Sequence, residues 1–189
     1  MRGSSLSSSG PWSRARVTAT VRSVWLALLV FGPMLVEARL AARNESAQRS
    51  RGGVEPAGDV YGWMRVAYPA VFLCMIAEGF ARGDGARWLA VGLTSFALAK
   101  ALKWWAIASL GRRWTFRVIV VPGDTRVTSG PYRVARHPNY LAVIGELLGV
   151  ALTTDARVSG PLGILLFGAL VLRRVTVEDR ALDAILRAS

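Results

Sequence analysis

Five apolar runs, separated by short polar segments rich in arginine, limit most strongly what this chain can fold into. A helix that crosses a bilayer needs about 20 mostly apolar residues. Apolar residues make up 52% of the 189 positions, and the mean hydropathy is +0.35. This pattern predicts an all-α integral membrane protein with about five transmembrane helices. The predicted helices cover about residues 22–42, 60–80, 87–109, 138–154 and 158–182.

The runs also contain ionisable residues, which are costly in hydrocarbon and must face the bundle interior unless they lie near a helix end. Lys100 and Lys103 stand beside Trp104, so we expect their ammonium groups to extend to the membrane surface. Glu146 is the ionisable residue deepest in the fourth helix, and Arg65 is a possible structural partner for it. A soluble all-α domain with buried helices is the alternative that this composition leaves open.

The segments between the runs indicate how the chain is organised. Residues 1–20 are rich in Ser, Gly and Arg and predict a disordered basic tail, followed by a single domain over residues 21–189. The run 23–36 could be a signal-peptide core, but no small-residue cleavage site follows it, which favours a retained helix. Gly and Pro residues mark 43–59 as a polar loop. Only the short segment 154–157 separates the last two helices, which should therefore form a hairpin.

The chain is strongly basic, with 24 basic residues against 12 acidic ones and a net charge of +12. The arginines lie in short clusters between apolar runs, which is typical of the cytoplasmic ends of membrane helices rather than of a nucleic-acid-binding face. More of them fall on the side of the 110–138 loop, which predicts that this side is cytoplasmic. We therefore expect membrane lipids and no nucleic acid as partners, while the oligomeric state stays open.

Cys74 is the single cysteine, so the sequence has no disulfide framework and no cysteine-based metal site. It lies inside an apolar run, where a free cysteine is usually a small buried packing residue. We therefore predict a packing role for Cys74 and no bound metal.

A polar loop over residues 130–140 (G-P-Y-R-V-A-R-H-P-N-Y) interrupts the apolar pattern before the fourth helix. Pro138 suits the first position of that helix. The loop should then bring Arg136, His137 and Tyr140 to a helix N-terminus, which favours an anionic group. A lone histidine is more often structural, but this polar setting between membrane helices favours a binding or catalytic role for His137.

The fifth predicted helix ends in R-V-T-V-E-D-R-A-L, which places Arg174 and Glu178 four residues apart on one face. The simplest interpretation is an ion pair on a solvated helix, worth under about 1 kcal/mol. The predicted hairpin, however, returns this segment to the side of the polar loop. An Arg, a Glu and a His that converge there would make a site for a charged cofactor.

These two motifs, G-P-Y-R-x-x-R-H-P-N-Y and, after a helical hairpin, R-V-x-V-E-D-x-x-L, resemble the isoprenylcysteine carboxyl methyltransferase family. The likeness is to its bacterial membrane methyltransferases, including the alkylpyrone-type polyketide O-methyltransferases. It covers about residues 30–186, because E-A-R-L-A-A-R-N-E and G-G-V-E in the first half are also similar. The first motif is the more specific, since Asp179 stands in the second where the family usually has glutamate.

The resemblance implies S-adenosylmethionine as cofactor, held at the cytoplasmic face between the polar loop and the end of the fifth helix. Carried over by motif position, the residues that would line the cofactor pocket are Val127, Arg136, His137, Tyr140 and Glu178. Val127 would contribute backbone contacts, and Glu178 would pair with the amino group of the cofactor. Arg174 would orient the carboxylate side or the acceptor, which would be lipophilic and would enter sideways between the helices.

The acceptor group is open at this stage, being a carboxyl or hydroxyl group of a prenylcysteine-like or polyketide-like compound, or an amine. A carboxylate acceptor needs no base, whereas an enol or phenol needs one, for which His137 or Glu146 could serve. The predicted catalytic residues are Arg174, Glu178 and Glu146.

Three other functions remain as alternatives. Similar loops with a carboxyl-terminal hairpin occur in membrane sterol and steroid reductases, which would transfer hydride from NADPH. Asp179 and the end of the chain at Ser189 depart from the family pattern, which leaves a member that binds cofactor without turnover. A small membrane scaffold with a basic cytoplasmic face is the non-enzymatic alternative.

Overall fold

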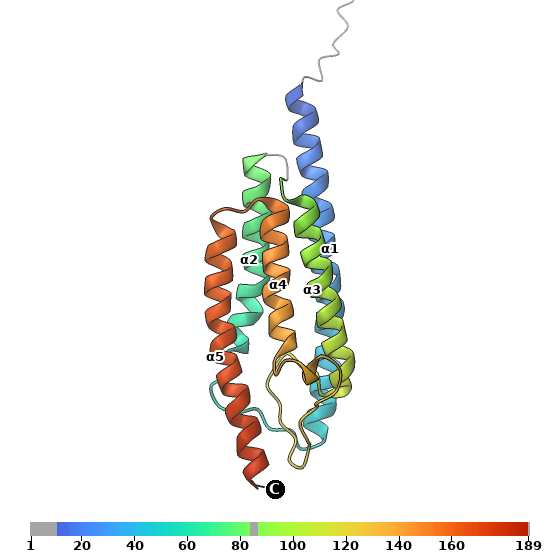
Figure 1. The fold of residues 1–189 in the computed structure, drawn as a ribbon, viewed down its shortest axis with the longest axis vertical. Coiled ribbons are helices and arrows are strands. Elements are labelled where there is room, and N and C mark those ends of the chain that lie inside the picture. The colour runs from blue at the N-terminus through green and yellow to red at the C-terminus, as the bar shows by residue number, and fades with distance from the viewer. Residues whose placement is uncertain (1–10, 84–86, 189) are drawn as a thin grey trace, which may run out of the picture.

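The computed structural model describes residues 11–83 and 87–188. Five α-helices run side by side along the long axis of the molecule (Figure 1). They are α1 (Pro11–Ser50), α2 (Tyr61–Arg82), α3 (Leu89–Leu110), α4 (Pro138–Thr154) and α5 (Ser159–Ala188). Two 3₁₀ turns, η1 (Gly111–Arg113) and η2 (Gly130–Arg133), lie between α3 and α4. Within the described residues the fold is all-α, as predicted, and its β pairing is limited to the isolated bridge between Val54 and Val120.

Helices α2 to α5 lie where the apolar runs predicted them, and α4 has the predicted bounds. Pro138 occupies the first position of α4, where its missing N–H costs nothing. Asp155 ends the helix in the left-handed conformation, with φ at 51°. The predicted hairpin of α4 and α5 is therefore confirmed.

Helix α1 starts earlier than predicted. It begins at Pro11, so the disordered tail predicted for residues 1–20 is wrong for residues 11–20. Proline is favoured at the first helical turn, and the residues that follow it carry the helix without a break into the apolar run. Residues 1–10 lie outside the described part of the chain.

Helix α1 also ends later than predicted, since it continues to Ser50 through part of the expected 43–59 loop. Two amide side chains of these extra turns are tied to the polypeptide that follows α3. Asn44 donates from Nδ2 to the carbonyl oxygen of Trp114 at 2.8 Å, and Gln48 Nε2 donates to that of Arg112 at 2.7 Å. These tertiary contacts favour the helical conformation where the local composition predicted a loop.

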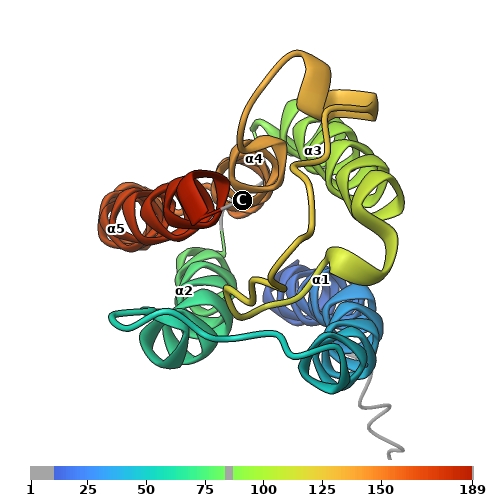
Figure 2. The ribbon, with the colours of Figure 1, turned by 90° about the horizontal axis from the view of Figure 1, so that it is seen from below.

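Seen along the helix axes, the bundle is a ring in the order α1, α2, α5, α4 and α3 (Figure 2). Helices α3 and α4 approach most closely, because glycines lie at their contact. A Cβ atom on Gly149 would lie 2.6 Å from the backbone nitrogen of Phe96, and one on Gly92 would lie 2.5 Å from that of Thr153. Small residues that let backbones approach in this way are typical of helix packing in membranes.

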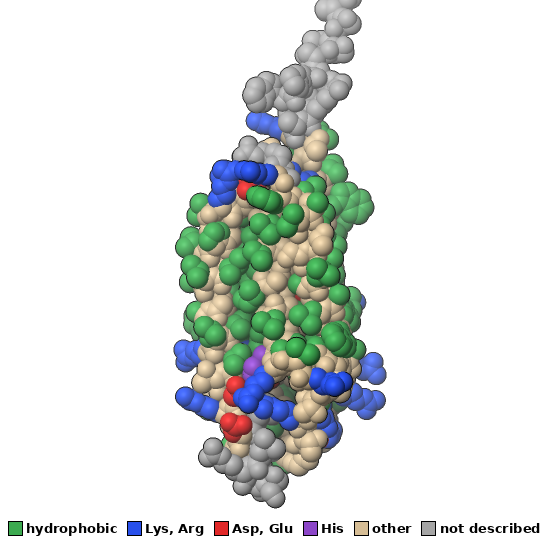
Figure 3. All heavy atoms as spheres, viewed as in Figure 1, with side chains coloured by type: hydrophobic (Ala, Val, Ile, Leu, Met, Phe, Trp, Pro, Cys, Tyr) green, Lys and Arg blue, Asp and Glu red, His purple; other side chains and the backbone are tan. Residues whose placement is uncertain are grey.

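The outside of the bundle is apolar over most of its length. Large hydrophobic side chains such as Trp25, Leu98 and Leu165 are more than half exposed. Figure 3 shows apolar side chains across the middle of one face, with Lys and Arg above and below them. Among the residues that the structure describes, three helical segments are long and apolar enough to cross a membrane: Arg16–Ser50, Tyr61–Arg82 and Ser159–Ala181. This belt fits a bilayer, although the predicted total of five spans stays a prediction.

Lys100 and Lys103 do not extend to the membrane surface as predicted. Lys103 is 3% exposed and its Nζ lies 2.7 Å from Glu37 Oε2, while Lys100 Nζ lies 3.0 Å from Glu37 Oε1. Both lysines also contact Glu146, at 3.0 Å from Lys100 and 3.4 Å from Lys103. The ammonium groups of both lysines point into the bundle because the carboxylates of Glu37 on α1 and Glu146 on α4 lie there. We call Glu37, Lys100, Lys103 and Glu146 the charge cluster.

The predicted pairing of Glu146 with Arg65 is also wrong. Arg65 is exposed, whereas Glu146 is 1% exposed and accepts a further hydrogen bond from the Tyr68 hydroxyl at 2.6 Å. Lys100 and Lys103 lie closer in the interior and neutralise the carboxylate there.

Cys74 is exposed on the outside of α2, so the predicted packing role inside the core is a further error. The buried face of α2 at this level is formed by Phe72 and Met75 instead. A cysteine is apolar enough for the outer face of a membrane helix as well as for a core.

Candidate active site

A cavity with a volume of about 360 Å³ lies at the end of the bundle where α3 ends and α4 begins. This is within the range of about 300–1,000 Å³ that is usual for small-molecule sites. The segment 113–128 forms one wall, and the first turn of α4 and the end of α5 form the other. The loops at the lower end of Figure 1, which face the viewer in Figure 2, surround it.

The start of α4 brings His137 and Tyr140 into this cavity. His137 is the cap residue, and Tyr140 follows it in the first turn, with their rings 5.7 Å apart. The Tyr140 hydroxyl donates to Glu178 Oε2 at 2.8 Å. His137 Nε2 lies 3.1 Å from Asp179 Oδ1, and its Nδ1 lies 3.8 Å from Glu178 Oε2. The polar loop and the end of α5 therefore converge, as their motifs predicted.

Arg174 contacts the Tyr140 hydroxyl from the buried side of the cavity wall. Its side chain is 6% exposed, and its Nε donates to the Tyr140 hydroxyl at 2.8 Å. One terminal nitrogen forms an ion pair with Asp59 Oδ1 at 2.6 Å, and the other donates to the carbonyl oxygen of Phe116. The partner of Arg174 is thus Asp59, not Glu178 as the helical spacing had indicated.

Asp59 is the residue of this site that the sequence reasoning missed. Besides Arg174, its carboxylate accepts the backbone N–H groups of Tyr61 and Val118, each at 3.0 Å. An Asp two residues before a helix start is a recognisable N-terminal signal. Its pairing with Arg174 had no sequence signal, because the two residues lie 115 positions apart.

Asp179 was noted only as a departure from a motif, yet it contacts two residues of the cavity wall. It lies 3.1 Å from His137 Nε2 and 3.1 Å from a guanidinium nitrogen of Arg126. The Asp179 carboxylate can accept a hydrogen bond from His137 Nε2, which would fix the orientation of the imidazole ring in the cavity wall.

Most predicted site residues meet in the cavity. Those that line it are Val127, Arg136, His137, Tyr140, Arg174 and Glu178. Arg136 is exposed there. Glu146, the remaining predicted catalytic residue, does not line the cavity and lies in the charge cluster.

Two further polar groups in the cavity wall have unusual surroundings. Burial raises the pKa of the Tyr132 hydroxyl, and the negative charge of Glu178 raises it further, so this group stays protonated. The Oδ1 atom of Asn139 is buried and has no hydrogen-bond partner among the described residues. An unpaired buried acceptor is costly, so Asn139 is suited to meet a donor from a ligand.

Comparison with known proteins assigns the family. Residues 90–184 match the isoprenylcysteine carboxyl methyltransferase (ICMT) family, and this span holds the whole cavity wall from α3 to α5. The chain belongs to this family, whose members are membrane methyltransferases. At the level of the family, it is therefore a methyltransferase and a membrane protein.

Two bacterial relatives extend the match beyond the family region. The chain is 31% identical over 149 residues to the uncharacterized protein YpbQ of Bacillus subtilis, which covers 78% of this chain and 88% of that protein. It is 23% identical over 146 residues to an uncharacterized protein of Haemophilus influenzae, over 76% of this chain and 85% of the relative. No solved structure matches the chain.

The cavity fits the cofactor that the resemblance implied. S-adenosylmethionine carries an ammonium group, a carboxylate, a sulfonium and an adenine ring. Glu178 offers a carboxylate to the cationic groups, Arg136 offers a guanidinium to the carboxylate, and Asn139 has its unused acceptor. The apolar wall of Val118 to Val121 suits the flat face of a base.

Proposed function

We propose that this protein is an S-adenosylmethionine-dependent methyltransferase that methylates a carboxyl or hydroxyl oxygen of a lipophilic acceptor at the membrane. The observation that carries the proposal is the convergence of His137, Tyr140 and Glu178 on one cavity at the end of an apolar helical bundle. Family membership supports the reaction class, and the apolar belt supports a lipophilic acceptor.

Charged residues of the cavity would bind the groups of opposite charge on the cofactor. Glu178 would hold the amino group of the cofactor, Arg136 its carboxylate, and Val127 would contribute backbone contacts. His137 and Tyr140 would complete the wall around the sulfonium. The cofactor would supply the methyl group, whose S–CH₃ bond breaks as the new O–CH₃ bond forms and the positive charge on sulfur disappears. The protein mainly needs to align the two partners and exclude water.

Arg174 is best suited to a positioning role. Three of its nitrogen donors are already used by Tyr140, Asp59 and the Phe116 carbonyl. It would therefore fix the Tyr140 hydroxyl, and through it Glu178, rather than bind the acceptor directly.

The acceptor determines whether a base is needed. A carboxylate is already ionised, whereas a hydroxyl must lose its proton, and His137, which lines the cavity while Glu146 does not, is our candidate base for that case. By the excess of arginines at the cavity end of the bundle, we place this end in the cytoplasm and the helices in a bacterial inner membrane.

Cofactor binding tests the proposal. The purified full chain in detergent should bind S-adenosylhomocysteine in titration calorimetry, and both His137→Ala and Glu178→Gln should weaken binding about tenfold or more, the value of a hydrogen bond to a charged group. Arg133→Ala is the matched control, since Arg133 is an exposed arginine of η2 outside the cavity wall.

The same titration separates the alternatives. Binding of NADPH without S-adenosylhomocysteine would replace the methyltransferase by a reductase. Failure of both ligands to bind would favour the scaffold. Binding without transfer of a methyl group to any lipid extract would favour a member that binds cofactor without turnover.

A further inference from the structure

A groove on the outer face of the bundle, between α1 and α3, lies apart from the active-site cavity. Its volume is about 530 Å³, and all but one of its lining side chains are apolar. These apolar side chains are Leu29 of α1 and Leu93, Phe96, Ala97, Ala101 and Trp104 of α3. The exception is Lys100, at 14% exposure.

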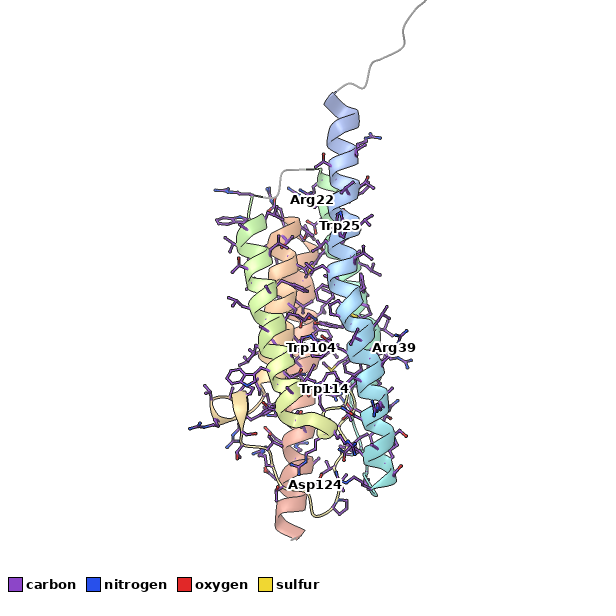
Figure 4. All side chains as sticks on the ribbon, turned by 90° about the vertical axis from the view of Figure 1, so that its right-hand side faces the viewer. Arg22, Trp25, Arg39, Trp104, Trp114 and Asp124 are labelled. Carbon is purple, nitrogen blue, oxygen red and sulfur yellow. The ribbon has the colours of Figure 1, made fainter. Side chains whose placement is uncertain are left out.

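The groove lies where two neighbouring helices of the ring are least closely packed. Helix α3 packs along α4, and α1 packs on α2, but among the described residues the backbones of α1 and α3 hardly approach each other. At the level of the charge cluster, Glu37 of α1 bridges this seam through its ion pairs with Lys100 and Lys103. Figure 4 looks at the seam from outside, with Trp104 labelled on α3 and Trp25 and Arg39 on α1.

The ammonium group of Lys100 is the polar group of the groove, and it lies 5.5 Å from the centroid of the Phe96 ring, which also lines the groove. An ammonium group has three N–H bonds, and two of them point to Glu37 Oε1 and Glu146 Oε2, each at 3.0 Å. The groove thus joins an apolar channel to one polar group, the Lys100 ammonium, whose third N–H bond is not accepted by a carboxylate among the described residues.

We propose that this groove binds the hydrocarbon chain of a membrane-soluble amphiphile whose hydroxyl or carbonyl oxygen accepts a hydrogen bond from Lys100. A neutral polar end fits better than an anion, because two lysines and two glutamates already balance in the charge cluster.

The groove adjoins the active site through one apolar layer. Trp104 of the groove and Leu110 of the cavity wall pack on the same small cluster, formed by Ala41, Ile107 and Trp114. The inference deepens the proposed function and rests on it in one respect, namely that the bound amphiphile is the methyl acceptor. The α1–α3 seam would then be the side on which the acceptor leaves the bilayer.

Photolabelling tests binding in the groove without any methyl transfer. The full chain is reconstituted in phosphatidylcholine vesicles with hexadecan-1-ol that carries a diazirine in mid-chain, or with the matching hexadecane. We expect the alcohol to label the α3 peptide 89–110 about tenfold more than the hydrocarbon does, the value of one hydrogen bond to a charged group. Lys100→Met should remove that preference.

Two surface variants keep the test valid if Lys100→Met fails to fold. Ala97→Trp fills the groove and should abolish labelling of α3. Leu98→Trp, on the next, outward-facing residue of the same helix, should leave labelling unchanged. Even labelling of α3 and of the exposed face of α5, or labelling that survives Ala97→Trp, would overturn the inference. Binding of S-adenosylhomocysteine to the wild-type chain is measured in parallel. If it does not bind, the proposed function is contradicted, while binding of the alcohol in the groove is tested independently.

Discussion

Two polar networks inside one bundle show different ways to place charges in an apolar protein. The charge cluster lies between the helices, and its members are paired with one another. The network of Asp59, Arg174, Tyr140 and Glu178 lies at the end of the bundle and is buried on one side only, since Arg174 is 6% exposed and Glu178 is 31% exposed. The first network joins helices, and the second points side chains into a cavity.

The two networks should therefore differ in whether a mutation lowers the stability of the protein or its affinity for a ligand. Buried charges need partners within the protein, so the charge cluster should be sensitive to the loss of any one member. In the network at the end of the bundle, Tyr140 and Glu178 line the cavity, so the loss of the contact between them should cost little stability, but a ligand that depends on their geometry should bind less well. We therefore expect mutations in the charge cluster to reduce stability and mutations at Tyr140 and Glu178 to reduce affinity.

The largest effect should come from Lys103→Met. This change leaves two buried carboxylates against one lysine, which should lower the free energy of unfolding by about 3–5 kcal/mol. Unfolding in mixed detergent and dodecyl sulfate micelles measures this loss. The double variant with Glu37→Gln should recover much of it, because the numbers of charges match again.

The control for Lys103→Met is Arg65→Met, which removes an exposed cation from α2. It should change stability by less than about 1 kcal/mol. Equal losses of unfolding free energy for the two variants would mean that a lysine of the charge cluster stabilises the fold no more than an exposed arginine does.

An intermediate effect is expected from Tyr140→Phe. The variant keeps the ring but removes the hydroxyl that joins Arg174 to Glu178. Affinity for S-adenosylhomocysteine should fall about tenfold, while the free energy of unfolding should change by about 1 kcal/mol. Calorimetric titration and detergent unfolding measure the two quantities. A large loss of stability with unchanged affinity would reverse the comparison between the two networks.

The smallest effect concerns pH and the loop that precedes α2. Burial alone would raise the pKa of the Glu55 carboxyl, but hydrogen bonds from Arg49 and Arg117 outweigh it, and the pKa is lowered on balance. Its contribution to stability is therefore present above the unfolded pKa of about 4.3. It is lost as the pH falls through the lower, folded value.

Since Glu55 is 26% exposed, the loss should amount to less than about 1 kcal/mol. Unfolding curves between pH 6 and about pH 3 should show it in the wild type and not in Glu55→Gln. Identical pH profiles for the two proteins would mean that Glu55 stabilises nothing.

Local rules were sufficient for much of the fold and of the site. The bounds of α4 were predicted correctly because Pro138 and the short turn at 154–157 are local signals that no distant contact changes. His137, Tyr140 and Glu178 were predicted to meet because a short hairpin has only one way to return. Where distant contacts entered, as at the end of α1, local composition was misleading.

The sequence by itself determined the helices, their apolar belt and the family, since all of these follow from spacing and residue type along the chain. Only the tertiary structure decided the partners of the buried charges. Lys103 pairs with Glu37 and Arg174 with Asp59, because a buried charge takes whichever opposite charge the folded bundle brings within a few ångströms. Distance along the chain has no part in that choice, so sequence spacing could not predict it.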